Sequence, residues 1–240
     1  NGASYRGKPL GSMGEVGCFS FQQYKIITAG EGGLLCTDDE WLYGRARTQH
    51  DCAARYWLRR NEEIYDIAGE DYRLSELSAA LVLAQMDRLD PLLSHFRHCK
   101  KRIVDGIKDL AGIEVAPSPD PEGDAGIAIM FYTESEDTSR RFAQALDAEG
   151  VECGTMYNQG IPDRHIFCYW PFVNRPQSDE KICPWTCGCR EKEIRYTPDM
   201  CPKTLNYLGR AISIGIHQKL TDSQCDQMVE AIRKVAGALF

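Results

Sequence analysis

The chain has 240 residues, of which 43% are hydrophobic and 26% are charged. These values are ordinary for a globular protein, and they exclude a disordered, collagen-like or coiled-coil chain. Its 28 basic and 35 acidic residues give a net charge of −7. That charge argues against nucleic-acid and anionic-membrane partners, because both need a basic surface. No apolar run approaches the roughly 18–20 residues that span a bilayer.

The start of the chain and its cysteines indicate its context. The chain begins without a methionine, in a turn-rich segment without a signal-peptide pattern, so we expect a piece of a longer protein. Its eleven cysteines are an odd number, which rules out complete intramolecular disulfide pairing. Cys18, Cys36, Cys99 and Cys225 stand in apolar or helical settings, where free thiols act as small buried hydrophobes. We therefore expect a reducing compartment, and the cytoplasm is favoured.

Two short buried strands are the first predicted elements, at residues 16–21 and 34–37. A glycine-rich loop separates them, and such loops let a backbone turn sharply or approach a ligand. Asp38 or Asp39 is expected to cap a helix that follows. A polar, irregular stretch then covers residues 48–72. It contains an arginine group that either binds an anionic sugar or is a solvated charged loop: Arg55, Arg59 and Arg60.

Two helices come next, one over residues 75–90 with an apolar face near the 3.6-residue period. The second helix runs to about residue 110, with Pro91 at the break between the two. Residues 116–124 are rich in proline and acidic residues and are predicted to form a linker. A smaller α/β pattern follows. Its strands are expected at residues 127–132, 151–156 and 211–216 and its helices at 138–149 and 222–239, around a loop-rich stretch at 157–202.

Lys25 is the first candidate for chemistry, because it lies between the two predicted buried strands. Burial penalises an ammonium group and lowers its pKa, and a lysine with a lowered pKa is what Schiff-base chemistry requires. Ser20 lies five residues earlier at a strand end, where its hydroxyl group is able to meet a phosphate. The alternative is that Lys25 extends its charge into solvent from the strand end.

A zinc site is one interpretation of the spacing of Cys183, Cys187 and Cys189. A further thiolate or imidazole would complete four ligands. The spacing is not the usual paired Cys-x₂-Cys, so reduced loop thiols are the favoured interpretation, and we predict no metal.

The run from Gly11 to Gly33 contains Ser20-Phe21-Gln22-Gln23-Tyr24-Lys25 and then Gly30-Glu31-Gly32-Gly33. It resembles the cofactor-lysine segment of the DegT/DnrJ/EryC1/StrS family of pyridoxal-phosphate-dependent sugar aminotransferases. The segments Gly69–Ala80 and Ala84–Asp90 are similar to the family's helix after the active-site loop. The chain after Pro119 resembles the branch that aminates the 8-position of a 3-deoxy-octulosonate sugar, the 8-amino-3,8-dideoxy-octulosonate transaminases.

The resemblance implies an α/β fold, the C-terminal portion of the aspartate-aminotransferase-like architecture (fold type I). Residues 1–115 would form the remainder of the large pyridoxal-phosphate domain with its linking helices, and residues 116–240 a small C-terminal α/β domain. It also implies a homodimer whose active sites lie between subunits, with the 48–72 loop reaching across and the helices after Ser75 organising the contact. The substrates would be a keto or aldehydo sugar and an amino-acid donor, glutamate or glutamine.

The resemblance also assigns residues. Lys25 matches the lysine that binds the cofactor covalently and moves a proton, and Ser20 matches the phosphate-contacting serine. Asp71 stands where the family usually has an asparagine that reaches the partner subunit's cofactor phosphate, and a carboxylate there repels a phosphate. The candidate substrate residues are Arg73, His165 and Trp170; a core role for Trp170 stays open.

The resemblance places a further portion of about 150 residues upstream, roughly a domain in length. It would carry the aspartate that pairs with the pyridine nitrogen and supports the electron sink of the cofactor. The 240 residues would then contain the lysine but lack most of the residues that bind the cofactor, so activity of this chain alone is doubtful. Two alternatives stay open: a non-catalytic fragment, or a dehydratase or regulatory relative on the same fold.

Overall fold

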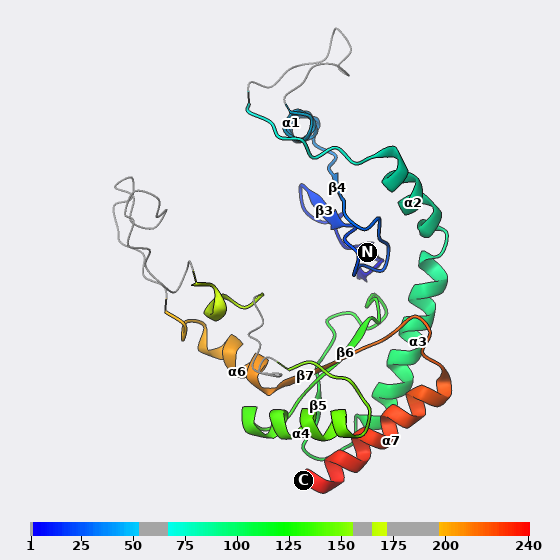
Figure 1. Cartoon of the computed structure of the whole chain (residues 1–240), viewed down its shortest axis with the longest axis vertical. Helices are drawn as coiled ribbons and strands as arrows, with labels where there is room; N and C mark the ends of the chain where they lie inside the picture. The colour runs from blue at the N-terminus through cyan, green and yellow to red at the C-terminus, as the bar shows by residue number, and fades with distance from the viewer. Residues whose placement is uncertain (1, 53–66, 156–164, 172–196) are drawn as a thin grey trace. The chain divides into compact units, whose positions relative to one another are not determined.

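A computed structural model describes residues 2–52, 67–155, 165–171 and 197–240 (Figure 1). The chain divides into two compact units, one of Asn1–His98 with Pro117–Ile127 and one of Cys99–Ala116 with Ala128–Phe240. Each unit therefore contains two separate stretches of chain. The predicted division into domains at residues 115 and 116 stays a prediction. Within the described residues, no helix is both long and apolar enough to cross a membrane.

Among its described residues, the first unit contains two antiparallel pairs of strands, two whole helices and the first half of a third. β1 (Ser4–Tyr5) pairs with β2 (Lys8–Pro9), and β3 (Gly17–Ser20) pairs with β4 (Gly33–Cys36) so that Ser20 faces Gly33. The helices are α1 (Glu40–His50), α2 (Glu76–Met86) and the first half of α3 (Leu89–Ile107). The side chains of Asp39 and Ser75 cap α1 and α2 by accepting the amides of Leu42 and Ser78.

The β3–β4 hairpin forms where the sequence predicts two strands, but it is not buried. β4 is exposed along its whole length, with Leu34 at 52% and Leu35 at 43%. Cys18 and Cys36 are exposed as well, so the prediction that these two thiols are buried is wrong. The sequence pattern indicates only that the strands are apolar. Their burial also requires another element that packs over them, and the local sequence does not show such an element.

The break between α2 and α3 comes earlier than predicted. α2 ends at Met86 with Asp87 as its C-cap, and α3 begins at Leu89. Pro91 lies in the first turn of α3, where a proline is tolerated because the first amides of a helix have no intrahelical acceptor.

The predicted linker packs against the first unit. The Ser4 amide donates to the Gly123 carbonyl at 2.8 Å, and the Arg6 amide donates to Asp120 Oδ2 at 2.6 Å. Gly126 has a φ of +77° and lies so close to α3 that an added Cβ would be 2.6 Å from the Arg97 amide nitrogen. A side chain cannot occupy that space, so the approach of this segment depends on glycine.

The second unit is an antiparallel sheet with helices packed against it. The strands β5 (Glu114–Val115), β6 (Ala128–Tyr132) and β7 (Ala211–Gly215) lie in the order β5-β6-β7. α4 (Glu136–Ala148) contacts β7 and two other helices, α6 (Pro202–Arg210) and α7 (Asp222–Leu239). Phe131 of β6 and Phe142 of α4 meet edge-on at 5.5 Å in a fully buried core.

Several elements of the second unit differ from the sequence prediction. Residues 151–155 contain only an isolated bridge, between Gly154 and Ser213. α4 begins two residues earlier than expected, because Ser135 caps it. β5, α6 and the short 3₁₀ turn η2 (Phe167–Tyr169) were not predicted. The start of α6 had a local signal, since Pro202 stands at its first turn.

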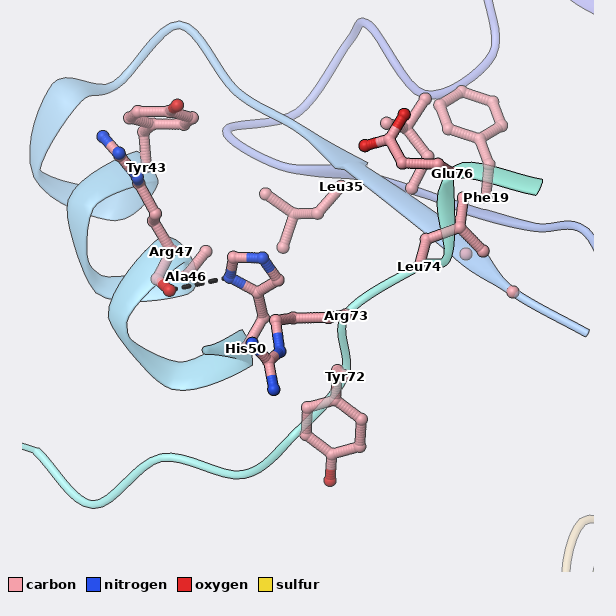
Figure 2. A pocket seen from close by; sticks show the side chains of 13 residues that line it. Phe19, Leu35, Tyr43, Ala46, Arg47, His50, Tyr72, Arg73, Leu74 and Glu76 are labelled. Atoms are coloured by element: carbon pink, nitrogen blue, oxygen red, sulfur yellow. Dashed lines mark hydrogen bonds between the residues drawn. The ribbon is translucent and has the colours of Figure 1, made fainter. Parts of the chain in front are cut away.

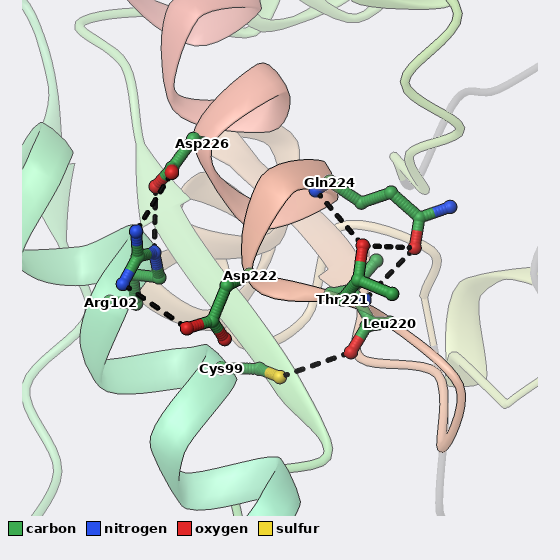
Figure 3. Close-up of polar contacts among 7 residues, drawn as sticks. All are labelled: Cys99, Arg102, Leu220, Thr221, Asp222, Gln224 and Asp226. Carbon is green, nitrogen blue, oxygen red and sulfur yellow. Dashed lines mark hydrogen bonds and ion pairs between the residues drawn. The ribbon is translucent and has the colours of Figure 1, made fainter.

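α3 and α7 are joined by the polar contacts of Figure 3. Arg102 donates from Nε and Nη2 to the two carboxylate oxygens of Asp226, at 2.6 and 2.7 Å, and its Nη1 lies 3.5 Å from Asp222. Thr221 and Gln224 form a capping box at the start of α7. The buried Cys99 thiol donates to the Leu220 carbonyl at 3.8 Å.

Candidate active site

Lys25 lies on the loop that joins β3 to β4. The loop turns immediately after β3, since the Gln22 amide donates to Ser20 Oγ at 3.2 Å and the Lys25 amide to the Gln22 carbonyl at 2.9 Å. Gln22 also forms a bridge with Gly30, which closes the loop. The sequence prediction that Ser20 stands at a strand end beside the Lys25 loop therefore agrees with the structure.

A small apolar core lies beneath the loop. Phe21, Ile27 and Val82 of α2 are buried, and Leu89 packs against them. The Ala29 amide donates to the Phe21 carbonyl at 2.8 Å. Two side chains on either side of Lys25 are thus fixed by burial, and the lysine is carried on an anchored loop.

The Lys25 side chain itself is exposed. Its ammonium group has no hydrogen bond or ion pair with any residue that the structure describes. The expectation that Lys25 is desolvated between buried strands is therefore wrong for the described residues. The physical reason is that β4 of the hairpin is exposed along its length, so no described element covers the loop that carries Lys25.

Gln85 of α2 is hydrogen-bonded to the backbone of Thr28 in the loop that carries Lys25. Gln85 Nε2 donates to the Thr28 carbonyl at 2.5 Å, and the Thr28 amide donates to Gln85 Oε1 at 3.3 Å. Thr28 Oγ1 donates to the Phe21 carbonyl at 3.0 Å and accepts the Gly30 amide at 2.9 Å. The sequence prediction missed Gln85. The signal available was an amide in the last turn of an otherwise largely apolar helix.

A pocket of about 1010 Å³ opens beside the hairpin, lined by β3, β4, α1 and residues 72–76 (Figure 2). The ring of His50 points toward Leu35 in Figure 2. His50 Nδ1 donates to the Arg47 carbonyl at 2.7 Å, which fixes the tautomer because a carbonyl only accepts. The pocket combines apolar walls with charged side chains of both signs, including Arg47, Arg73 and Glu76.

Asp71 and Arg73 are brought together. The Arg73 guanidinium meets both carboxylate oxygens of Asp71 at 3.1 Å, and the Arg73 amide donates to Oδ1 at 3.1 Å. These hydrogen bonds hold the pKa of Asp71 below its usual range, with a smaller effect from the charges of Arg73 and His50. Arg73 is therefore already engaged by a carboxylate.

Asp51 is the second carboxylate beside Arg73, and the sequence prediction missed it. It is only 6% exposed, and its Oδ1 lies 3.4 Å from Arg73 Nε. No described residue donates a hydrogen bond to that oxygen. Asp51 faces Asp71 in an isolated antiparallel bridge, flanked by hydrogen bonds from the Glu70 and Tyr72 amides to the Gln49 and His50 carbonyls. A buried carboxylate needs its cation, so Arg73 ties these two segments together.

The other predicted site residues lie in the second unit or outside the described residues. His165 is exposed, and Trp170 is half-buried just after η2, with its amide donating to the Phe167 carbonyl at 3.0 Å. No His, Cys, Asp or Glu cluster that could hold a metal is present within the part of the chain that the structure describes. The remaining candidates lie outside that part: Arg55, Arg59, Arg60, Cys183, Cys187 and Cys189.

Comparison with known proteins assigns the family. The DegT/DnrJ/EryC1/StrS aminotransferase family matches residues 1–170. The chain belongs to this family. GDP-perosamine synthase of Caulobacter vibrioides is 41% identical over 97 residues, which are 39% of this chain and 24% of that protein. L-glutamine:scyllo-inosose aminotransferase of Streptomyces griseus is 32% identical over 195 residues, which are 76% of this chain and 44% of that protein.

Solved structures of the family share the fold. Spr1654 of Streptococcus pneumoniae, described as a putative sugar aminotransferase and solved in its PLP form, aligns with a TM-score of 0.71 at 20% identity. The alignment covers 100% of this chain and 56% of that one. The prediction of a fold type I, aspartate-aminotransferase-like architecture is confirmed. The chain spans about half the length of the structures it matches.

Proposed function

We propose that the protein containing this chain is a pyridoxal-phosphate-dependent aminotransferase that moves an amino group from glutamate or glutamine to a keto or aldehydo sugar. One observation carries the proposal: an exposed lysine without a partner among the described residues stands on a loop anchored at both ends. Similarity to an L-glutamine aminotransferase and to a perosamine synthase supports these two substrate classes.

Pyridoxal phosphate is the cofactor of the family, and the residues present fit it in part. Lys25 offers a side chain without a partner among the described residues for covalent attachment, and Ser20 offers an exposed hydroxyl at the end of β3. When bound, the cofactor supplies the electron sink that stabilises a carbanion. We propose that Lys25 holds the cofactor and moves the proton, while Ser20 donates a hydrogen bond to a phosphate oxygen.

Asp71 fits a phosphate poorly by itself, since both groups are negative. We propose that the Asp71–Arg73 ion pair meets the phosphate as a unit, because the guanidinium offsets the carboxylate charge. Arg73 then acts beside the cofactor while it remains bound to Asp71. His165 and Trp170 are proposed substrate-pocket residues, since a histidine and an aromatic ring suit a sugar's hydroxyl groups and apolar face.

The assembly and the compartment are part of the proposal. We propose a homodimer organised by α2, because this helix carries leucines that are largely exposed, Leu77 at 85% and Leu83 at 68%. Apolar patches of this kind usually mark an interaction site. Free thiols throughout the described residues support a reducing compartment, the cytoplasm.

The test is covalent labelling of the full-length protein. Incubation with pyridoxal phosphate, borohydride reduction and peptide mapping should place the pyridoxyl mass on Lys25, and Lys25→Arg should abolish it. Lys8→Arg is the control, because Lys8 is also exposed and lies in the first unit. Label on another lysine would contradict the assignment.

A second measurement separates transamination from the dehydratase alternative. With ¹⁵N-labelled glutamate or glutamine and a nucleotide-linked keto sugar, the aminotransferase should deliver the label to the sugar. A deoxygenated sugar without ¹⁵N would favour a dehydratase instead.

A further inference from the structure

Gln85 and Thr28 form the one side-chain connection that the described residues show between α2 and the backbone of the Lys25 loop. The amide of Gln85 donates to the carbonyl of Thr28 at 2.5 Å and accepts from the amide of the same residue at 3.3 Å. Both hydrogen bonds join residues 57 positions apart in the chain. A side-chain amide that satisfies both polar groups of one residue fixes that residue in two directions.

Thr28 transmits this constraint to the rest of the loop. Its hydroxyl group joins the Phe21 carbonyl and the Gly30 amide, which are the two ends of the loop that carries Lys25. Ile27, the neighbouring residue, is 2% exposed and packs in the apolar core with Val82 of α2. The loop that carries Lys25 is therefore held to α2 by an apolar cluster around Val82 and by one pair of hydrogen bonds.

We infer that Gln85 is a positioning residue that holds the Lys25 loop against α2, so that the lysine amine is presented at a fixed point. The inference rests on the proposed function for its catalytic consequence. The anchoring of the loop can be measured without it.

The chemistry of the contact explains why glutamine is needed. Glutamate has the same length but lacks the donor, and its carboxylate would face the Thr28 carbonyl oxygen. Methionine fills similar space but makes neither hydrogen bond. Glutamate can still accept the Thr28 amide but leaves the Thr28 carbonyl without a donor, and methionine leaves both groups without this partner. A lost partner costs free energy in a part-buried site.

The experiment compares Gln85→Glu and Gln85→Met with Gln23→Glu in the full-length protein. Gln23 is exposed on the same loop, so its change makes the same chemical substitution away from the contact. Amide hydrogen exchange is followed in the peptide that contains Thr28 and Ala29. We expect exchange to rise on the order of tenfold in both Gln85 variants, which is about the effect of losing a net hydrogen bond of ~1.4 kcal/mol, and to be unchanged in Gln23→Glu.

Kinetics test the catalytic consequence. In the Gln85 variants kcat should fall about tenfold while KM for the amino donor and the sugar changes by less than about threefold, as expected for lost presentation rather than lost binding. Exchange at wild-type level in both variants would overturn the anchoring role. Raised exchange with unchanged kcat would overturn the positioning role. Failure of wild-type Lys25 to take the pyridoxyl label would overturn the proposed function, and the exchange data would still decide the anchoring.

Discussion

The described thiols differ widely in burial. Cys99, Cys153 and Cys225 are buried, whereas Cys18 and Cys36 of the hairpin are exposed. Burial raises the pKa of the Cys153 thiol to about 11. Burial, with a smaller effect from the hydrogen bond to Cys99, raises the pKa of Cys225 to about 12. Because the thiolate is the reactive form, Cys153 and Cys225 are protected both by their burial and by their raised pKa.

Alkylation should show this division. At pH 8 a thiol of pKa about 11 is ionised in roughly one molecule in a thousand, so iodoacetamide should modify Cys18 and Cys36 within minutes and leave Cys153 and Cys225 unmodified. The labelling of Cys153 should increase only when the pH approaches its raised pKa of about 11. Mass spectrometry of the native protein reports each site, and unfolding in urea should expose all of them. Equal labelling rates for Cys18 and Cys153 would contradict the assignment.

The same thiols show how far the burial of a single residue can be predicted from the local sequence. Cys99 and Cys225 were predicted to be buried from helical patterns, and they are, since each apolar helix face carries the information locally. Cys18 and Cys36 were predicted to be buried from an apolar strand, and they are not. The partners of Asp51 and Gln85 could not be found from the sequence, because Arg73 and Thr28 are 22 and 57 positions away from them. The isolated amide of Gln85 in an apolar helix was the one local signal.

At the scale of elements, α3 and α7 approach closely at Gly106. A Cβ on Gly106 would lie 2.6 Å from Val229 Cγ1 and 2.7 Å from Cγ2, closer than real contacts allow. Arg233 Nε donates to the Gly106 carbonyl at 2.8 Å in the same place. The spacing of the two helices is thus set by the absence of a side chain.

Gly106→Ala should destabilise the protein although alanine favours a helix by about 1 kcal/mol. Overpacking costs about 1–3 kcal/mol, so a net loss is expected in urea unfolding. Val229→Ala makes room for the new methyl group, and the double variant should lose less stability than the sum of the two single changes, by about 1 kcal/mol or more. If the stability losses of the two single variants simply add, the two helices accommodate the Gly106→Ala methyl group without any energetic coupling to Val229.

The Arg102–Asp226 contact should make stability depend on pH in a defined direction. The hydrogen bonds from Arg102 hold the pKa of Asp226 below its ordinary value. A lowered pKa in the folded state stabilises the protein above the unfolded pKa of about 3.9, and that stabilisation is lost as the pH falls through the folded pKa.

Thermal unfolding of Arg102→Gln should therefore show a lower melting temperature than wild type at pH 7, with a difference that shrinks below pH 4. Lys101→Gln is the matched control, because the Lys101 ion pair with Asp105 lies within α3 and is exposed. Its effect should be smaller at every pH. A difference for Arg102→Gln that stays constant down to pH 2 would indicate lost packing instead.

Elements with local signals were predictable, and elements that depend on distant partners were not. Asp39 and Ser75 mark helix starts in the sequence as they do in the structure, since a capping side chain acts within three residues. β5 has only two residues and exists because it pairs with β6. Residues 151–155 alternate buried and exposed side chains at Val151, Glu152 and Cys153 like a strand, but they meet β7 only at Gly154.

At the scale of the whole molecule, α2 exposes apolar side chains on more than one side of the helix, and such side chains favour a partner. Leu77, Leu81, Leu83 and Met86 are 48–85% exposed on one helix. In the full-length protein, sedimentation equilibrium should show a dimer at micromolar concentration. Leu77→Glu with Leu83→Glu should convert it to monomer without loss of helix content.

The control for this assembly is Tyr43→Glu, which places the same charge on an exposed residue of α1, 55% exposed, and should leave the dimer intact. A wild-type protein that stays monomeric would contradict the proposed homodimer. A double variant that unfolds rather than dissociates would show that another part of the same polypeptide covers α2.

The return of residues 117–127 to the first unit has a consequence for synthesis. The Arg6 amide and the Asp120 carboxylate are bonded across 114 positions, so at ~5–20 residues per second the N-terminal strands wait roughly 6–23 seconds for this partner to be translated. α3, which contributes residues to both units, is translated within that interval. Residues 1–98 therefore cannot complete the folding of the first unit in the order of translation, because residues 117–127 are part of it. A fragment cut at residue 115 would lack the segment that completes it, whereas one that ends at residue 127 would keep it.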